Sequence, residues 1–382
     1  MDFNLSEQEL SVQKLARDFA QNEIAPIIMK YDEAQEFPME IAKKLGEVGF
    51  LGIIFPEEYG GANFSTMEYA IIVEEISKVD PSMGLSIAAH NGLCSNHIFK
   101  FASDDLKKKY LPDLTSGKKL GAWGLTENVS GSDAAGMATT AERKNGNYIV
   151  NGSKLFITHG TVGETAVITA ITDKSKRKNG ISAFVIEKGW EGFRSGKKEN
   201  KLGMRSSDTS ELIFENLKVP AENMIGEEGQ GFKQCMQILD GGRIAIAALS
   251  LGIAQGALDA SLKYSKERKQ FGKSLSEFQG IQFKLSDMAT EIDAARLLTY
   301  KAAYFKDQGR DINLQAAMAK YYASEVATRA TNESIQIHGG YGFLKDFPVE
   351  KLYRDVKLMT IGEGTSEVQK MVIARNILNM YE

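Results

Sequence analysis

The spacing of hydrophobic positions divides the chain into three parts. In the first part, residues 1–120, a capping-box pattern of Ser6 and Glu9 precedes apolar residues at helical spacing, beginning with Val12 and Leu15. Glycine and proline separate several such amphipathic stretches. The pattern predicts about five helices before residue 118. The first part is therefore predicted to be an N-terminal helical domain.

From residue 121 to residue 228, short β-rich segments replace the helical period. These segments lie at 148–150, 155–158, 166–169, 181–186, 212–214 and 217–219. Asn-Gly pairs at 145–146, 151–152 and 179–180 are typical of tight turns between strands. Several short strands at regular spacing predict a compact antiparallel barrel or sandwich as the middle domain.

The helical period returns in residues 229–382. The apolar positions of one long predicted helix are Ile281, Leu285, Met288, Ile292 and Ala295. The most apolar run, 244–258, is shorter than the roughly 20 residues that span a bilayer, so a buried helix is predicted there. Breaks near 270–275 and 308–312 predict a C-terminal helical bundle. The whole chain is predicted to have a multi-domain α+β fold.

The composition excludes some classes of function but does not identify one. The 382 residues include 46 Lys+Arg and 50 Asp+Glu, which gives a net charge of −4, and there is no basic block. No nucleic-acid partner and no membrane partner are therefore expected. Cys94 and Cys235 have no metal-ligand spacing and are interpreted as reduced thiols. The first residues lack a targeting pattern, so a soluble cytoplasmic protein is expected.

Three glycine-rich stretches are candidates for ligand contact. The hydroxyls and glycines of 124–133 could surround a polar ligand, or the stretch could be an ordinary decorated loop. Residues 226–231 resemble a phosphate loop, but two adjacent glutamates and the lack of a βαβ pattern favour a domain linker. The glycines of 336–343 either cap a helix or bring bare backbone amides to a pyrophosphate.

Glu363 stands between two glycines, so few local side chains surround its carboxylate, which could be bare and mobile enough to accept a proton. The alternative interpretation of this segment is a helix start. Thr365 or Ser366 would then cap the helix, and Glu367 would favour its positive end. We expect both interpretations to hold: Glu363 takes part in the chemistry, and Thr365, Ser366 and Glu367 have structural roles.

The remaining candidates carry less information. The four histidines show no ligand pairing, so no metal site is expected. No nucleophile elbow surrounds a serine, and neither cysteine lies in a nucleophile motif. Arg243 and Arg268 could each bind phosphate, although a single arginine is more often a solvated or salt-bridged surface residue.

Taken together and in this order, these segments resemble the acyl-CoA dehydrogenase family, most closely its short-chain (butyryl-CoA) members. The resemblance covers almost the whole chain. It rests on the segments 56–61, 124–133, 202–208, 336–355 and 363–367. Such a protein has an N-terminal helical domain, a middle β domain and a C-terminal four-helix bundle. On this reading the domains are 1–120, 121–228 and 229–382.

The resemblance also implies a site for FAD between the middle and C-terminal domains, at a subunit interface of a homotetramer. The residues that would line the flavin are Trp123, Leu125, Thr126, Ser130, Gly131, Ser132, Phe156, Ile157 and Thr158. Those that would hold the phosphates and the adenosine end, partly from a neighbouring subunit, are Arg268, Phe271, Gln279, Gln336, Ile337, His338, Gly339 and Gly340. Thr365, Ser366 and Glu367 would complete the site. The acyl-CoA contacts implied are Ser132, Asp240, Gly241, Gly242, Arg243 and Gly364.

The family's chemistry is the α,β-dehydrogenation of an acyl-CoA thioester. The α-hydrogen is a weak acid, so the reaction needs a positioned base and a stabilised enolate. The resemblance assigns the base to Glu363, with its pKa raised in a dry pocket. It also implies that the backbone N–H of Glu363 and a ribityl hydroxyl of FAD donate hydrogen bonds to the thioester oxygen. The β-hydride would go to flavin N5, and the electrons to an electron-transfer flavoprotein.

Several positions bear on the substrate. Some relatives carry the base one residue before the CoA-contacting arginine, where this chain has Gly242, which points away from the isovaleryl and long-chain branches. The segment 79–86 has no arginine for a second carboxylate. Three residues depart from the usual family pattern: Asn128 replaces a proline, Phe156 a tryptophan and Gly362 a tyrosine that lines the acyl pocket.

A short-chain substrate is therefore expected. A medium-chain or branched short-chain dehydrogenase is the alternative within the family. A flavin monooxygenase or oxidase and a non-catalytic CoA-thioester binder are the alternatives on the same scaffold.

Overall fold

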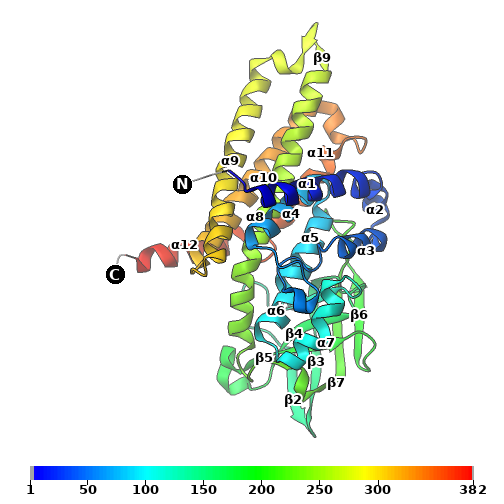
Figure 1. The fold of residues 1–382 in the computed structure, drawn as a ribbon, viewed down its shortest axis with the longest axis vertical. Coiled ribbons are helices and arrows are strands. Elements are labelled where there is room, and N and C mark those ends of the chain that lie inside the picture. The colour runs from blue at the N-terminus through cyan, green and yellow to red at the C-terminus, as the bar shows by residue number, and fades with distance from the viewer. Residues whose placement is uncertain (1–3, 381–382) are drawn as a thin grey trace.

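A computed structural model describes residues 4–380, and its N-terminal part is helical, as predicted (Figure 1). Its α-helices are α1 (Glu7–Phe19), α2 (Ile28–Ala34), α3 (Met39–Glu47), α4 (Thr66–Val79), α5 (Pro81–Ala89), α6 (Asn96–Phe101) and α7 (Asp104–Thr115). The capping box of Ser6 and Glu9 is present at the start of α1. The prediction of about five helices was too low, because α2 and α6 are too short to show a helical period.

The middle part is a single eight-stranded sheet. Its strands are β1 (Gly121–Gly124), β2 (Thr140–Lys144), β3 (Asn147–Thr158), β4 (Thr165–Ile171), β5 (Ile181–Glu187), β6 (Phe193–Lys198), β7 (Thr209–Pro220) and β8 (Met224–Ile225). The order is β6-β7-β3-β2-β4-β5-β8, with β1 also paired to β4. Most neighbours are antiparallel, as predicted, but β1 and β2 each pair with β4 in parallel.

One predicted turn is wrong. Asn151-Gly152 does not separate two strands but lies inside the long strand β3, where the register with β7 shifts between Val150 and Gly152. Gly152 has φ 142°, and a Cβ there would lie 2.5 Å from the Thr139 hydroxyl oxygen. The pair is therefore a β-bulge that brings the backbone close to Thr139. Asn145-Gly146 does form the turn between β2 and β3, with positive φ at both residues.

The C-terminal part is again helical. Its elements are α8 (Gly231–Glu267), the small hairpin β9 (Lys269–Gln270) and β10 (Lys273–Ser274), α9 (Gln279–Asp307), α10 (Asn313–His338), α11 (Pro348–Asp355) and α12 (Ser366–Asn379). The predicted apolar face of α9 is directed inward: Met288, Ile292 and Ala295 are buried, and Ile281 and Leu285 pack against the same core. Figure 1 shows the hairpin at one far end of the molecule and the sheet at the other.

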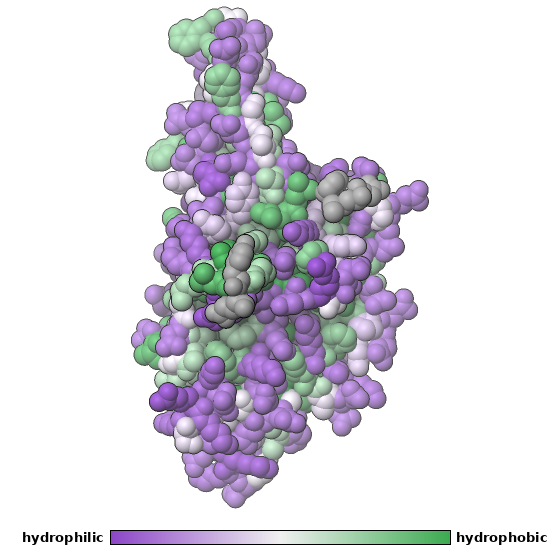
Figure 2. All heavy atoms as spheres, turned by 90° about the vertical axis from the view of Figure 1, so that its left-hand side faces the viewer, coloured by the Kyte–Doolittle hydropathy of each residue, from purple (hydrophilic) through white to green (hydrophobic). Residues whose placement is uncertain are grey.

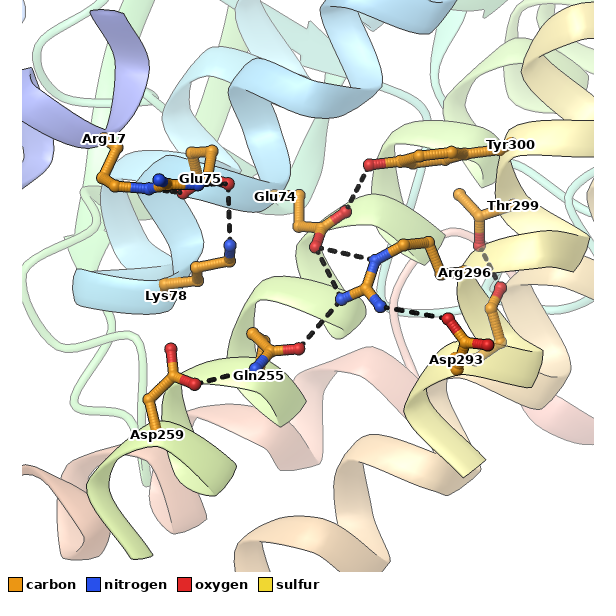
Figure 3. A network of polar contacts seen from close by, with 11 residues as sticks. Arg17, Glu74, Glu75, Lys78, Gln255, Asp259, Asp293, Arg296, Thr299 and Tyr300 are labelled. Carbon is orange, nitrogen blue, oxygen red and sulfur yellow. Dashed lines mark hydrogen bonds and ion pairs between the residues drawn. The ribbon is translucent and has the colours of Figure 1, made fainter. Parts of the chain in front are cut away.

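The N-terminal and C-terminal helical parts share one apolar core, in which α4 packs along α8. A polar network within this packing fixes three helices relative to each other (Figure 3). The buried carboxylate of Glu74 on α4 accepts hydrogen bonds from Arg296 (3.0 Å) and Tyr300 (3.0 Å) on α9. Arg296 also donates to Gln255 on α8 at 2.9 Å. Because the polar groups of these side chains have hydrogen-bond partners within the network, the network specifies how α4, α8 and α9 are arranged.

Helix α8 is the central element of this arrangement. Among residues 4–380 it alone is long and apolar enough to cross a membrane by length and composition, and 78% of that apolar window is buried inside the protein. The buried stretch includes the 244–258 run that was predicted to be a core helix. Cys94 and Cys235 are both free and buried, and burial raises the pKa of each thiol to about 12.

Candidate functional site

The candidate base, Glu363, lies in the short loop between the 3₁₀ turn Val356–Thr360 and α12. Glu363 (φ 52°) and Gly364 (φ 92°) are both in the left-handed backbone region. This conformation costs a non-glycine residue about 1–2 kcal/mol, because its Cβ crowds the carbonyl oxygen. The Gly364 carbonyl accepts hydrogen bonds from Lys320 Nζ (2.7 Å) and Gln369 Nε2 (2.9 Å). The loop is thus held by side chains of α10 and α12 rather than being mobile.

The Glu363 side chain is directed at helix α8. Its Oε2 atom is buried and has no hydrogen-bond partner in the protein. A Cβ built on Gly242 would lie well inside van der Waals distance of that oxygen, and 3.3 Å from Leu93 Cδ2. Gly242 therefore leaves the space that the carboxylate occupies. A larger residue at this position would displace it.

Burial determines the protonation of this carboxylate. It raises the pKa of Glu363 to about 7, while the positive charges of Lys320 and Arg243 act in the opposite direction. A carboxylate with this pKa is ionised in part at neutral pH and has enough proton affinity to act as a base. The geometry and the charge environment therefore both fit proton abstraction.

Arg243 lies next to this carboxylate on α8 and is almost fully buried. Its Nη1 donates to Asp240 at 2.7 Å, and Asn313 donates to the same carboxylate oxygen at 2.9 Å. Its Nε is buried and has no partner in the protein. Since buried polar groups are rarely left unpaired, this free donor is suited to a polar ligand.

One wall of the space beside Gly242 is apolar. Leu93 and the partly buried ring of Trp123 belong to one cluster with Ile238 of α8. The Trp123 indole donates to His97 Nδ1 at 3.0 Å, and His97 Nε2 lies 3.0 Å from Gln234 Oε1. Burial lowers the pKa of His97 to about 4, so this histidine is neutral. The chain of hydrogen bonds fixes the orientation of the indole ring.

The loop at 124–133 is fixed by internal hydrogen bonds, unlike an ordinary surface loop. The backbone groups of Glu127 and Ser130 exchange two hydrogen bonds of 2.9 and 3.1 Å. The Glu127 carboxylate accepts from the backbone N–H groups of Ala138 (2.5 Å) and Thr139 (3.2 Å), and from the buried Lys154 ammonium (2.6 Å). Leu125 is buried and Thr126 half-buried, whereas Gly131 and Ser132 are exposed on the outside of this turn.

Phe156 projects from the sheet next to this loop. It has φ 60° at a second register shift of β3, between Lys154 and Ile157, and 64% of its surface is exposed. Ile157 is buried and Thr158 half-buried. The bulge turns this aromatic ring outward and places Phe156 in the strained left-handed backbone region. Bulges and strained residues of this kind are common where a protein contacts a ligand. The ring and the adjacent hydroxyls fit one face of a flavin.

The predicted phosphate and adenosine residues lie elsewhere. Tyr264, Arg268, Gln270, Leu275, Ile337, His338, Gly339, Gly340, Tyr341 and Leu344 line an open groove of about 500 Å³. The His338 ring stacks on Tyr264 with 4.2 Å between centroids, and a Cβ at Gly339 or Gly340 would meet nothing within 4 Å. The groove therefore exposes bare backbone beside an arginine, which fits a pyrophosphate. Gln336 is exposed in the last turn of α10, Phe271 is 93% exposed between β9 and β10, and Gln279 is exposed at the start of α9.

One chain does not bring these two groups of residues together. The groove contains Arg268 and Gln270, at the hairpin at one far end of the molecule, whereas the 124–133 loop and Phe156 belong to the sheet part at the other end (Figure 1). Each group fits a part of FAD, one the ring and the other the nucleotide. A single chain therefore contains two half-sites in different parts of the molecule: the flavin half-site at the 124–133 loop and the nucleotide half-site at the groove.

The other predicted site residues have structural partners. Thr365 is the N-cap of α12 and accepts from the Val368 backbone N–H, as the helix-start interpretation predicted. Ser366 donates to Glu325 at 2.7 Å, and Glu367 is exposed in the first turn. Of the predicted linker 226–231, residues 226–230 connect β8 to α8 and Gly231 begins α8. Within 4–380, no group of three or more His, Cys, Asp or Glu side chains is arranged to hold a metal ion.

The sequence interpretation missed three residues of this site: Leu93, His97 and Lys320. Lys320 had a detectable signal, because it is a lysine among the buried alanines 316, 317, 319 and 323 of one helix. Leu93 and His97 had none. They lie in or next to the π-helical turn His90–Ser95, which follows α5 without a break in the sequence pattern.

Comparisons with known proteins agree over the whole chain. Acyl-CoA dehydrogenase domain families match at residues 6–118 (N-terminal), 122–217 (middle) and 229–378 (C-terminal). The short-chain specific acyl-CoA dehydrogenase of Clostridium acetobutylicum is 50% identical over 377 residues, 99% of this chain and 100% of that one.

Two solved structures superpose closely. The butyryl-CoA dehydrogenase of Megasphaera elsdenii has a TM-score of 0.97 at 46% identity and covers 99% of this chain and 100% of its own. A structure from work on the electron transferring flavoprotein of Acidaminococcus fermentans has a TM-score of 0.98 at 49% identity, with the same coverage.

Proposed function

Because the chain belongs to the acyl-CoA dehydrogenase family, we propose that Glu363 removes the α-proton of a short-chain acyl-CoA thioester bound between α8 and the 124–133 loop. The chain is an FAD-dependent enzyme that dehydrogenates acyl-CoA thioesters. The observation that carries the assignment of Glu363 is its carboxylate, which is buried, unpaired and directed at the bare backbone of Gly242.

The protein's own groups would act as follows. Glu363 is held in its left-handed turn, so its carboxylate has one direction and loses little freedom when substrate binds. It takes the proton from the α-carbon, and its backbone N–H donates to the thioester oxygen where negative charge develops. Arg243, whose Nε has no partner in the protein, would contact the acyl-CoA together with Asp240. When bound, FAD supplies the acceptor for the hydride that leaves the β-carbon.

The substrate class follows from the walls of the site. Leu93, Trp123 and Ile238 form an apolar surface, which suits an uncharged acyl chain. Gly242 leaves Glu363 as the base, and two of the relatives are named short-chain specific acyl-CoA dehydrogenase and butyryl-CoA dehydrogenase. Gly362 has no side chain and therefore adds no ring to the pocket. A Cβ built on Gly362 would lie 3.4–3.6 Å from atoms of Leu358. A straight short acyl chain is the proposed substrate, and a medium or branched chain is the alternative.

The distance between the two half-sites supports a homotetramer with FAD at a subunit interface. A neighbouring copy would contribute the groove at Arg268 and Gly339 to the flavin held by loop 124–133 of this chain. Large apolar side chains are exposed on the C-terminal part of the chain, including Phe271, Phe283, Phe343, Met371, Leu378 and Met380. Figure 2 shows apolar side chains gathered at mid-height on the face that carries α9 and α12. An electron-transfer flavoprotein is the proposed acceptor, in keeping with the similar structure from Acidaminococcus fermentans.

The test is anaerobic bleaching of the flavin by saturated acyl-CoA thioesters of graded length and branching. We expect the fastest bleaching with butyryl-CoA. In Glu363→Gln, FAD and ligand binding should remain while bleaching falls roughly 10³-fold or more, since a general base contributes about 10²–10⁴-fold. Glu142→Gln is the matched control, because Glu142 is exposed on β2 and is not one of the predicted site residues. Retained bleaching in Glu363→Gln would exclude Glu363 as the base.

A further inference from the structure

Lys320 is a fully buried lysine for which the proposed reaction has no role. Its side chain extends from α10 and its Nζ donates to the Gly364 carbonyl at 2.7 Å. Ala316, Ala319 and Ala323 around it on the helix are buried too. An ammonium group in such surroundings is costly unless charge or hydrogen bonds stabilise it.

A hydrogen bond alone does not explain this lysine. The Gly364 carbonyl already accepts from Gln369 Nε2 at 2.9 Å, and the same amide donates to the Glu363 carbonyl at 3.4 Å. A neutral donor therefore suffices to satisfy this backbone. What Lys320 adds is positive charge, and this charge acts on the carboxylate of Glu363, the residue that precedes Gly364 on the loop. Lys320 and Arg243 are the two cations whose fields favour the ionised form of Glu363.

The other charged groups around this pair come from four helices. On α8, Arg243 is bound to Asp240. On α10, Glu325 accepts from Ser366, and on α12, Glu367 is exposed to solvent. On α4, the Tyr69 hydroxyl donates to the Ala88 carbonyl at 3.0 Å and burial raises its pKa. Burial lowers the pKa of Lys320 to about 8, and the charge of Glu363 acts against that decrease. The lysine is therefore charged at the pH at which the glutamate must be ionised.

We propose that Lys320 is a positioning residue that holds the left-handed turn at Glu363 and Gly364 through the Gly364 carbonyl and keeps the Glu363 carboxylate ionised near neutral pH. The inference rests on the proposed role of Glu363 as the base. Lys320 has no contact with substrate in this arrangement. It acts through the loop and through its charge.

Three substitutions separate the charge from the hydrogen bond. Lys320→Gln keeps a donor for Gly364 but removes the charge, Lys320→Arg keeps both, and Lys320→Met removes both. The control is Arg329→Gln, nine residues further along α10, where the arginine pairs with Glu291 near the surface. Each variant is prepared as the FAD-loaded enzyme, and kcat for butyryl-CoA is measured against pH.

The rising limb of kcat reports ionisation of the base. In Lys320→Gln and Lys320→Met its midpoint should move up by about 1 pH unit or more, because a nearby cation lowers the pKa of a carboxyl by about 1–3. At pH 7 kcat should fall by about tenfold and recover at higher pH. Lys320→Arg should restore the midpoint to within a few tenths of a unit, and Arg329→Gln should leave it unchanged.

A second readout does not depend on turnover. Infrared spectra of the protein without substrate contain a band of the protonated Glu363 carboxyl, which is identified by its loss in Glu363→Gln. The pH midpoint of this band should move upward in Lys320→Gln in the same way. If Lys320→Met fails to fold, the glutamine and arginine variants still decide the question.

The outcomes are distinguishable. If Lys320→Gln lowers kcat by the same factor at every pH and leaves both midpoints in place, Lys320 is structural only and the inference is wrong. If wild-type enzyme is not reduced by acyl-CoA, or if Glu363→Gln retains turnover, it is the proposed function that fails.

Discussion

Two glutamates near the candidate site, the buried Glu127 and Glu363 with its buried Oε2, have opposite properties. Glu127 accepts two backbone N–H groups and the Lys154 ammonium, and although burial opposes its ionisation, these partners hold its pKa below the ordinary value. Glu363 has one oxygen without any partner, and burial raises its pKa to about 7. The partners supplied by the fold, rather than burial itself, decide which carboxylate is structural and which one can take a proton.

The largest expected effect comes from removing the charge of the structural carboxylate. Glu127→Gln leaves the Lys154 ammonium buried without a counter-charge, which typically costs about 3–5 kcal/mol. Urea unfolding of the FAD-loaded enzyme at pH 7 measures it. Glu142→Gln, on the exposed edge of β2, is the control and should change stability by less than about 0.5 kcal/mol. An equally small loss in Glu127→Gln would show that the pair contributes little.

The same substitution at the other glutamate should have the opposite sign. The pKa of Glu363 is higher in the folded protein than in the unfolded chain, so its contribution to stability is present at low pH and is lost as pH rises through about 7. Glu363→Gln should therefore increase the unfolding free energy by about 3 kcal/mol at pH 8 and by less than about 1 kcal/mol at pH 5. The measurement is urea unfolding at both pH values. A loss of stability at pH 8 would mean that Glu363 has ionic partners that outweigh its burial.

A smaller effect tests the direction of the Glu363 carboxylate. In Gly242→Ala the new Cβ would collide with Glu363 Oε2, so the carboxylate must move. We expect kcat to fall at least about tenfold, since small misplacements of a reacting group are costly. In Gly280→Ala, on α9, the new Cβ meets nothing within 4 Å, so this control gains helix propensity with little change in kcat. Equal kcat in the two variants would contradict the observed geometry.

Much of the fold was predictable because its local signals agree with its tertiary structure. The capping box at Ser6, the turn at Asn145-Gly146 and the apolar face of α9 each follow from residues close in sequence. Asn151-Gly152 has the same dipeptide signal as a turn but forms a bulge, because Thr139 lies against Gly152. A dipeptide cannot show which distant strand will pack against it.

The candidate site was predictable to a different extent. The family pattern identified Glu363 as the base and residues 124–133 as the flavin loop. These site assignments remain predictions, and so do the domain boundaries after residues 120 and 228. The pattern did not identify Lys320 or Leu93. Their importance depends on Gly364 and Gly242, which are 44 and 149 positions away in the chain.

By itself, the sequence determined the order of helical, β and helical parts, the family, and the presence of one carboxylate between two glycines. Hydrophobic period, capping residues and motifs are local properties, and a chain carries them before it folds. The tertiary structure alone decided that Glu363 is left-handed, unpaired and opposite Gly242, and that a buried lysine holds its loop. These properties depend on burial and on the partners brought by α8 and α10, because proton affinity in a protein is determined by the groups that surround a side chain in space.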